Sequence, residues 1–172
     1  MKKILISAAL VMASAFTGLA SAADGTISFT GKIIDDACNI KGSSPSIDFG
    51  TISEGSLSGA GTSTAATLFN IVLEDCPTAA TSAKITFDGP TDINNRSLLA
   101  VTTGSDAAEG VAVGFFEKDS TTLIPIGSAS ASQSLIPATD TTLEFIAKYV
   151  SNGAPVVAGT VNASADFTVT YN

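Results

Sequence analysis

The residues of this sequence best suited to chemistry are two cysteines, Cys38 and Cys76, and two pairs of adjacent carboxylates. A cysteine reacts as its thiolate, which usually needs a neighbouring base such as histidine. The sequence contains no histidine, which excludes triads of the Ser-His-Asp or Cys-His kind and zinc sites built on histidine. Two cysteines are also too few for a thiolate metal site. We therefore expect no catalytic residue, no metal and no cofactor.

The carboxylate pairs, Asp35-Asp36 and Glu74-Asp75, lie next to the cysteines. Neighbouring residues of a strand point to opposite faces, so neither pair makes a shared carboxylate site if its segment is extended. A glycosidase needs two carboxylates at a fixed separation. The 16 acidic residues permit such an enzyme formally, but nothing in their spacing supports it. We expect solvated charges near strand ends instead.

The first residues have the layout of a signal peptide. A basic start, Met1-Lys2-Lys3, precedes an apolar run over residues 4–15, and the small residues Ala20-Ser21-Ala22 follow. The run is short for a bilayer span of about 20 residues. Residues 1–22 are therefore predicted to be removed during export. About 150 residues remain, enough for one domain with its own core.

Charge and cysteine content indicate the environment of the mature chain. The net charge of −8 becomes more negative when Lys2 and Lys3 leave with the signal. An acidic surface argues against partners such as nucleic acid or anionic lipid. In an oxidising compartment, two cysteines predict one disulfide, Cys38–Cys76. Closing the loop between them would stabilise the fold by about 4 kcal/mol.

Short alternating runs separated by Gly, Pro, Asn and Asp predict an all-β protein. The expected strands are residues 26–34, 47–52, 68–75, 83–88, 110–117, 121–126, 141–150 and 160–171. Residues 53–64 are predicted to be a flexible loop or a weak edge strand. Strands of this length and spacing are typical of a β-sandwich of the immunoglobulin type.

The first and last predicted strands are strictly alternating, so each has one apolar face. The apolar face of the first consists of Gly25, Ile27, Phe29, Gly31 and Ile33. That of the last consists of Val161, Ala163, Ala165, Phe167, Val169 and Tyr171. A long apolar edge strand must be covered or it promotes aggregation. The first strand could cover it within its own domain or in another copy, and periodicity alone does not choose.

Several segments resemble the subunits of chaperone–usher fimbriae of the type 1 pilus kind. The stretch "GTISFTGKIIDDAC" is similar to the N-terminal extension of these pilins, and "IDFGTIS", "FNIVLEDC" and "LEFIAKYV" resemble later segments. The most specific match is "AGTVNASADFTVTYN", with a glycine fourteenth from the C-terminus, Gly159, and a penultimate aromatic, Tyr171. The resemblance covers residues 23–172.

This resemblance implies an incomplete immunoglobulin-like β-sandwich that lacks its seventh strand and is completed by a donor strand from another subunit. Residues 23–34 would be the N-terminal extension, with the donor residues Gly25, Ile27, Phe29, Gly31 and Ile33, and residues 35–172 the pilin domain. The acceptor groove, which the chaperone meets first, would involve Gly159, Phe167, Val169 and Tyr171. The extension before Cys38 is short for a major rod subunit, so rod and tip positions both stay open.

The resemblance also implies the partners and the location. These are other pilin subunits in a head-to-tail polymer, a periplasmic chaperone and an outer-membrane usher, with a host receptor reached through a tip adhesin. The chain would pass through the periplasm to the fimbrium on the cell surface and support adhesion without catalysing a reaction. The alternative from the residues alone is a self-complete secreted β-sandwich that binds a glycan or a protein.

Overall fold

The computed structural model of this chain describes residues 28–31, 37–42 and 45–172. The chain divides between Ile33 and Ile34 into two units, and each is described by itself. Among the described residues, no helix is long and apolar enough to cross a membrane. The same residues contain no group of three or more Cys, Asp or Glu side chains that could hold a metal ion.

The first unit is described only over residues 28–31. These residues form no strand and are exposed, Phe29 to 89%. The predicted strand 26–34 is therefore not formed in its described part, because an extended segment needs neighbouring strands to be stable. The rest of that strand and the predicted signal peptide, residues 1–22, lie outside the described residues.

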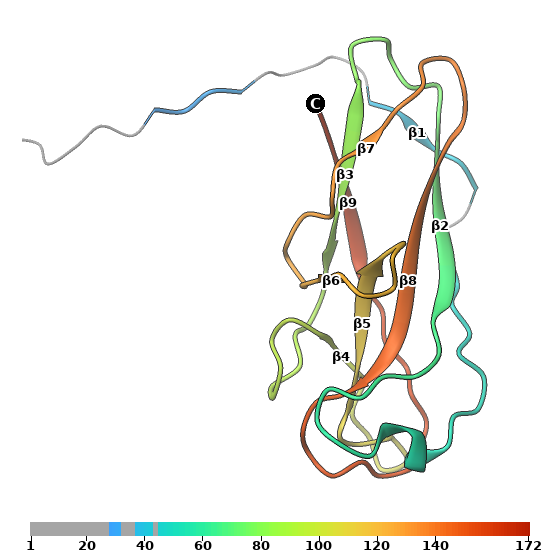
Figure 1. The fold of residues 1–172 in the computed structure, drawn as a ribbon, viewed down its shortest axis with the longest axis vertical. Coiled ribbons are helices and arrows are strands. Elements are labelled where there is room, and N and C mark those ends of the chain that lie inside the picture. The colour runs from blue at the N-terminus through green and yellow to red at the C-terminus, as the bar shows by residue number, and fades with distance from the viewer. Residues whose placement is uncertain (1–27, 32–36, 43–44) are drawn as a thin grey trace, which may run out of the picture. The chain divides into compact units, whose positions relative to one another are not determined.

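In its described part, the second unit contains two β-sheets, in which every strand pair is antiparallel, and a short 3-10 helix, Glu54–Leu57. The larger sheet has, in spatial order, β1 (Asn39–Ile40), β2 (Thr67–Glu74), β8 (Thr141–Ser151), β5 (Val111–Glu117) and β4 (Leu99–Ala100), with β6 (Leu123–Ile124) also paired to β5. The smaller sheet has the order β7 (Gln133–Ser134), β3 (Ser82–Asp88) and β9 (Asp166–Tyr171). Figure 1 shows these strands running along the length of the unit.

The core lies between the two sheets, because each long strand alternates buried and more exposed residues. Phe87 of β3 stacks on Phe115 of β5 with ring centroids 4.3 Å apart, and it meets Phe145 of β8 edge-on at 5.3 Å. Phe69 of β2 completes the cluster. Such aromatic pairs add about 0.5–1.5 kcal/mol each beyond the burial of their area. The two sheets therefore form one sandwich around a phenylalanine cluster.

Four of the predicted strands are confirmed. The expected strands 68–75, 83–88, 110–117 and 141–150 correspond to β2, β3, β5 and β8. Each has an inward row that is nearly fully buried, as in Leu143, Phe145 and Ala147. The predicted strand 121–126 is present only as the two residues of β6. Burial of one face is what makes such runs readable from sequence.

Other predictions need correction. Residues 47–52 form no strand. Of residues 53–64, the first part contains the 3-10 helix, and Ser63 forms only an isolated bridge with Val150. The last strand begins at Asp166 instead of residue 160, because residues 157–162 bond to a different part of the chain. β1, β4 and β7 were not predicted, because each has two residues and so shows no alternation of apolar and polar side chains.

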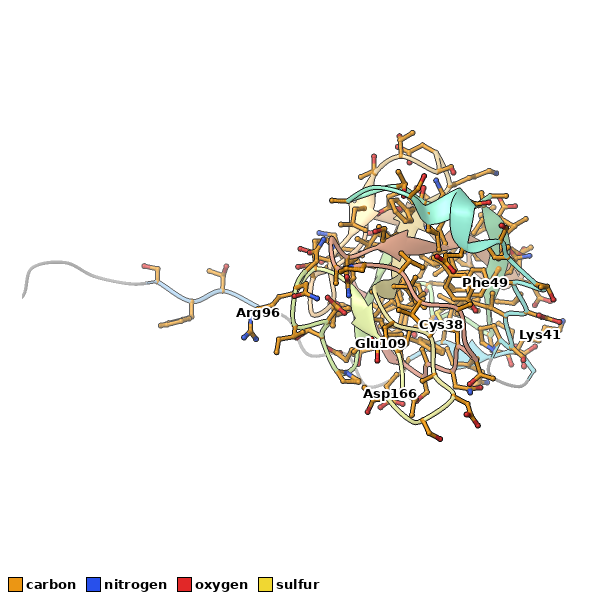
Figure 2. The ribbon with its side chains drawn as sticks, turned by 90° about the horizontal axis from the view of Figure 1, so that it is seen from below. Cys38, Lys41, Phe49, Arg96, Glu109 and Asp166 are labelled. Carbon is orange, nitrogen blue, oxygen red and sulfur yellow. A yellow bond between two sulfur atoms is a disulfide. The ribbon has the colours of Figure 1, made fainter. Side chains whose placement is uncertain are left out.

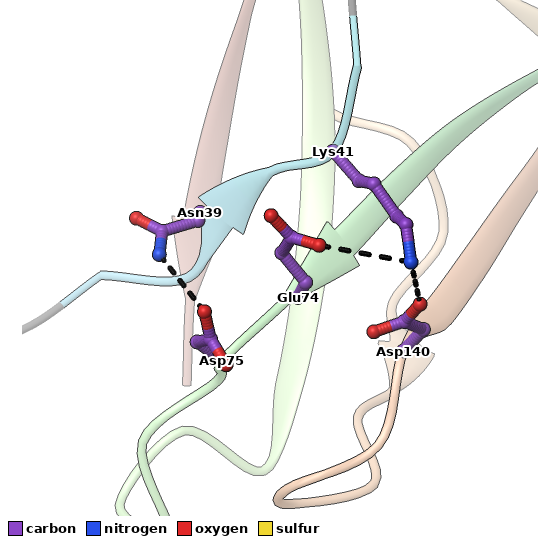
Figure 3. Close-up of polar contacts among 5 residues, drawn as sticks. All are labelled: Asn39, Lys41, Glu74, Asp75 and Asp140. Atoms are coloured by element: carbon purple, nitrogen blue, oxygen red, sulfur yellow. Dashed lines mark hydrogen bonds and ion pairs between the residues drawn. The ribbon is translucent and has the colours of Figure 1, made fainter.

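The structure contains the disulfide Cys38–Cys76, and both residues are buried. It joins the residue before β1 to the end of β2. Around it, Asn39 donates to the Asp75 carboxylate at 3.2 Å, while Lys41 pairs with Glu74 at 3.7 Å and with Asp140 (Figure 3). Lys41 and Asp140 are exposed and Glu74 is half-buried, so each ion pair contributes little.

The carboxylates beside this disulfide point to different partners. Glu74 faces Lys41 and Asp75 faces Asn39, so they form no shared site, as predicted. Hydrogen bonding to Asp140 raises the pKa of the Lys41 ammonium above its usual value, since it favours the charged form. The other pair, Asp35-Asp36, lies outside the described residues.

Candidate functional site: an open groove beside the last strand

Strand β9 is paired on one side only. In the smaller sheet it lies at the edge, bonded to β3 in a register that runs from Asp88 opposite Asp166 to Ala83 opposite Tyr171. Its alternate residues Phe167, Val169 and Tyr171 pack partly against the core, while the residues between them are exposed. Within the described residues, the other edge of β9 has no strand beside it. Its backbone and its apolar face are thus both available.

A groove opens beside the first residues of β9 and the segment 161–165 that leads into it. The first part of the groove is a cavity of about 640 Å³. It is bounded by residues 45–49 on one side and by residues 161–167 on the other. The floor is the core itself, contributed by Phe69, Ile71, Phe87, Leu99, Val113 and Phe115. A second cavity of about 680 Å³ continues it and shares five lining residues, Ile47, Phe49, Tyr149, Val161 and Asn162. The two cavities therefore form one long groove that reaches between the sheets.

The wall opposite β9 is the segment 45–52. Asp48 accepts a hydrogen bond from the backbone amide of Gly50 at 2.8 Å, and Gly50 has a φ of +64°, which glycine adopts readily. This turn directs Phe49 onto Tyr149 of β8, with ring centroids 4.2 Å apart. Figure 2 labels one residue of each wall, Phe49 and Asp166. Side-chain packing, and no ladder of backbone bonds, holds this wall in place.

Both tyrosines of the chain belong to this region. Burial raises the pKa of the Tyr149 phenol above its usual value, and the nearby Asp48 carboxylate raises it further. Burial also raises the pKa of the Tyr171 phenol, and a hydrogen bond with the backbone of Cys38 partly opposes that shift. Both groups are therefore neutral at physiological pH, and Tyr149 lines the groove as an uncharged ring.

Gly159 lies at the lower end of the groove, where two backbones come very close. A Cβ added to it would lie 2.4 Å from the carbonyl carbon of Ala107 and from the amide nitrogen of Ala108. The amide of Ala108 donates to the carbonyl of Thr160 at 2.9 Å, and the amide of Thr160 donates to the carbonyl of Asp106 at 2.7 Å. Any side chain at position 159 would push these segments apart. Glycine is therefore required by packing at this point.

The sequence-predicted residues occupy two parts of this site. Phe167, Val169 and Tyr171 lie on the inward face of β9, and Gly159 lines the lower cavity. The alternation predicted for the last strand continues below β9, since Val161 and Ala165 are half-buried, but Ala163 is exposed. Of the predicted donor residues, Phe29 and Gly31 are described and exposed. Gly25, Ile27 and Ile33 lie outside the described residues.

Some residues of the groove were not foreseen. Phe49 and Tyr149 line both cavities, where the two meet, and Ala107 and Ala108 form the base of the groove beside Gly159. Tyr149 could have been found, because it continues the inward row of strand 141–150. The close approach of Ala107 to Gly159 carries no local signal, since it joins residues far apart in the sequence.

Comparisons with known proteins agree with this geometry. The family model described as "Fimbrial protein" matches residues 27–172. The chain belongs to the fimbrial protein family. The probable major fimbrial subunit LpfA of Escherichia coli O157:H7 is 34% identical over 99% of this chain and 97% of its own length. The similarity to this relative therefore extends over almost the whole length of both chains.

Solved structures of pilus proteins have the same fold. The type I fimbria protein BPSL1626 of Burkholderia pseudomallei is 35% identical with a TM-score of 0.61, covering 80% of this chain and 91% of its own. A subunit of a chaperone–usher pilus is 25% identical with a TM-score of 0.66, covering 87% and 96%. The fimbrial subunit described here thus has the incomplete immunoglobulin-like pilin fold. It is a structural subunit of a chaperone–usher fimbria on the bacterial surface.

Proposed function

We propose that the groove accepts a strand from the N-terminal extension, residues 23–34, of another subunit. The observation that carries this proposal is the unpaired edge of β9 above an apolar groove that reaches the core. An inserted strand would gain backbone hydrogen bonds along β9 and would bury alternate side chains in the groove. It would supply the missing seventh strand of the sandwich.

The extension has the pattern that such a groove requires. Its apolar face places Ile27, Phe29 and Ile33 toward the acceptor, and burial of each would contribute about 1.5–3 kcal/mol before the cost of ordering the strand. Phe29 is almost fully exposed in the single chain, so it has most to gain. Gly31, on the same face, would occupy a shallow part of the groove.

Donor and acceptor are different surfaces of the same chain, so this contact is heterologous. Each subunit gives one strand and receives one, and such an interface extends into an open filament wherever its rotation does not close a ring. A head-to-tail polymer follows. The description of the relative LpfA as a probable major subunit supports a repeated position in the fimbria for this chain.

Export requires that the groove be covered before assembly. An open edge above apolar side chains promotes aggregation. We propose that residues 1–22 are removed on entry to the periplasm, where a chaperone covers the groove of the domain 35–172 at Gly159, Phe167, Val169 and Tyr171. The outer-membrane usher would then exchange the chaperone for the extension of the next subunit. The working residues form interfaces, and we expect no catalytic activity.

The test places one charge on each face of the extension. Phe29→Asp should leave the subunit folded on its chaperone but keep it out of the polymer, because a charge cannot enter an apolar groove without a large cost. Thr30→Asp adds the same charge to the opposite face and should polymerise. Material sheared from cells is run unboiled and boiled on a denaturing gel, since strand-complemented polymers dissociate only on heating.

Three results are informative. A ladder for Thr30→Asp and none for Phe29→Asp supports the donor face. Ladders for both variants would mean that the assignment of Phe29 to the donor face is wrong. A monomer band for the wild-type chain, without chaperone, would favour a self-complete sandwich and overturn the proposal.

A further inference from the structure

Asp92 is the only charged residue that is buried in the described part of the chain, at 7% exposure. It lies in the loop before β4. One carboxylate oxygen accepts hydrogen bonds from the backbone amides of Asn94 and Asn95, both at 2.9 Å. The other accepts a bond from the side-chain nitrogen of Asn152 at 2.9 Å. The carboxylate thus ties its own loop to the turn that follows β8.

Asn152, which Asp92 binds, is followed by Gly153. This Asn-Gly pair is the only one in the sequence. Such pairs deamidate readily, because glycine has no side chain to shield its backbone nitrogen. That nitrogen attacks Cγ of the asparagine, a new C–N bond forms, and the Cγ–Nδ2 bond breaks to release ammonia. The resulting succinimide takes up water and opens to aspartate or isoaspartate. The reaction needs no oxidant and no enzyme.

Hydrogen bonds restrain both polar atoms of the Asn152 side chain. Nδ2 of Asn152 donates to the Asp92 carboxylate, and Oδ1 accepts from the amide of Ala154 at 3.0 Å. The backbone amide of Asn152 donates to the carbonyl of Gly110, also at 3.0 Å. Nδ2 leaves as ammonia, so its bond to the Asp92 carboxylate must break during the reaction. A hydrogen bond to a charged acceptor is stronger than one between neutral groups, so this bond opposes the step.

We propose that Asn152-Gly153 is a deamidation site at which Asp92 slows the reaction. Asp92 acts as a positioning residue, since it binds the leaving nitrogen of Asn152 and restrains the orientation of that side chain. The product would place a second carboxylate against the buried oxygen that had accepted a hydrogen bond, which is unfavourable for like charges. This turn leads to Val157, which exchanges two backbone bonds of 3.1 Å with Glu109 at the base of the groove.

The experiment compares Asp92→Asn with the wild-type subunit in its assembled, folded form. Asparagine has the same shape and keeps an oxygen for the amides of Asn94 and Asn95, but it cannot accept as well from Asn152. The proteins are incubated at mildly alkaline pH, and the peptide containing residues 152–153 is analysed by mass spectrometry and for isoaspartate. We expect deamidation about tenfold faster in Asp92→Asn, because a bond to a charged acceptor is lost.

Controls separate positioning from general loosening. Asp106→Asn removes an exposed carboxylate that forms no hydrogen bond with Asn152. This variant should deamidate at the wild-type rate. Exposed Asn70 on β2 serves as an internal reference, and its rate should not change in any variant. Equal rates at Asn152 in wild type and Asp92→Asn would overturn the proposal, as would an acceleration shared by Asn70.

A second measurement needs no variant. The wild-type chain, denatured and reduced, should deamidate at Asn152 much faster than the folded chain, because both side-chain bonds are absent. If the folded and unfolded chains react equally fast, the geometry around Asn152 gives no protection and the proposal fails.

Discussion

The two walls of the groove are built in different ways. β9 is fixed to β3 through six residue pairs, whereas the segment 45–52 forms no strand and depends on the contact of Phe49 with Tyr149 and on the turn at Asp48. A backbone ladder sets position and register, while packed side chains can shift by small rotations. β9 is therefore the fixed template for an incoming strand, and the segment 45–52 is the wall that can adapt to it.

The adaptable wall is nevertheless tied to the domain by a covalent bond, and removing this bond should have the largest effect. Cys38–Cys76 closes the loop that contains residues 45–52. Replacing both cysteines by serine is expected to lower the free energy of unfolding by about 4 kcal/mol. Urea unfolding of the strand-complemented subunit measures it. A loss below about 1 kcal/mol would show that the wall is already ordered by other contacts.

The segment that leads into the fixed wall should be most sensitive at Gly159, where it packs on another part of the backbone. Gly159→Ala places a methyl group 2.4 Å from backbone atoms of Ala107 and Ala108, and such overpacking costs about 1–3 kcal/mol. Gly104→Ala is the matched control, because a Cβ there meets nothing within 4 Å. Thermal unfolding compares the two variants. Equal melting temperatures would mean that the base of the groove yields easily, and the contrast between the walls would disappear.

A smaller effect is expected from the adaptable wall itself. Phe49 is half-buried and packs on one ring, so Phe49→Ala should cost about 1–2 kcal/mol. Phe49→Leu keeps an apolar side chain and should recover about half of that loss. Urea unfolding and the rate of strand insertion are the measurements. A loss as large as that from deleting the disulfide would show that this wall is rigid.

The smallest effect concerns pH. Burial raises the pKa of Tyr149 and of Tyr171 above the ordinary value of 10.0. The unfolded chain therefore loses these protons first as the pH rises, so this contribution to stability is present below pH 10 and is lost above it. Tyr149→Phe and Tyr171→Phe should each make the alkaline decline less steep. Unchanged curves for both would argue that neither ring is desolvated in the groove.

The sequence predicted those parts of the fold in which periodicity and burial coincide. Strands such as 141–150 have an apolar residue at every second position facing the core, so their pattern is unambiguous. Two-residue strands such as β4 have no period, and their pairing is decided by neighbours distant in the chain. The Cys38–Cys76 disulfide was predictable because the compartment and the number of cysteines leave one pairing.

The candidate site was predictable only in part, for a physical reason. The face of Phe167, Val169 and Tyr171 follows from alternation. The same alternation continues through Val161, so the predicted strand runs too far, whereas the backbone there changes partner and the amide of Thr102 donates to the carbonyl of Asn162 at 2.7 Å. A period in side chains reports burial and does not report which backbone lies alongside.

The contact of Tyr149 with Phe49 also has an optical consequence. The chain has no tryptophan and two tyrosines, Tyr149 and Tyr171. Tyr149 lines the groove, and Tyr171 packs against the core from the end of β9. Residues 23–34 contain neither type. All near-ultraviolet tyrosine emission and circular dichroism of this chain therefore come from the acceptor side. Each subunit carries an intrinsic reporter of whether its own groove is filled, and strand exchange can be followed in real time without attaching a dye.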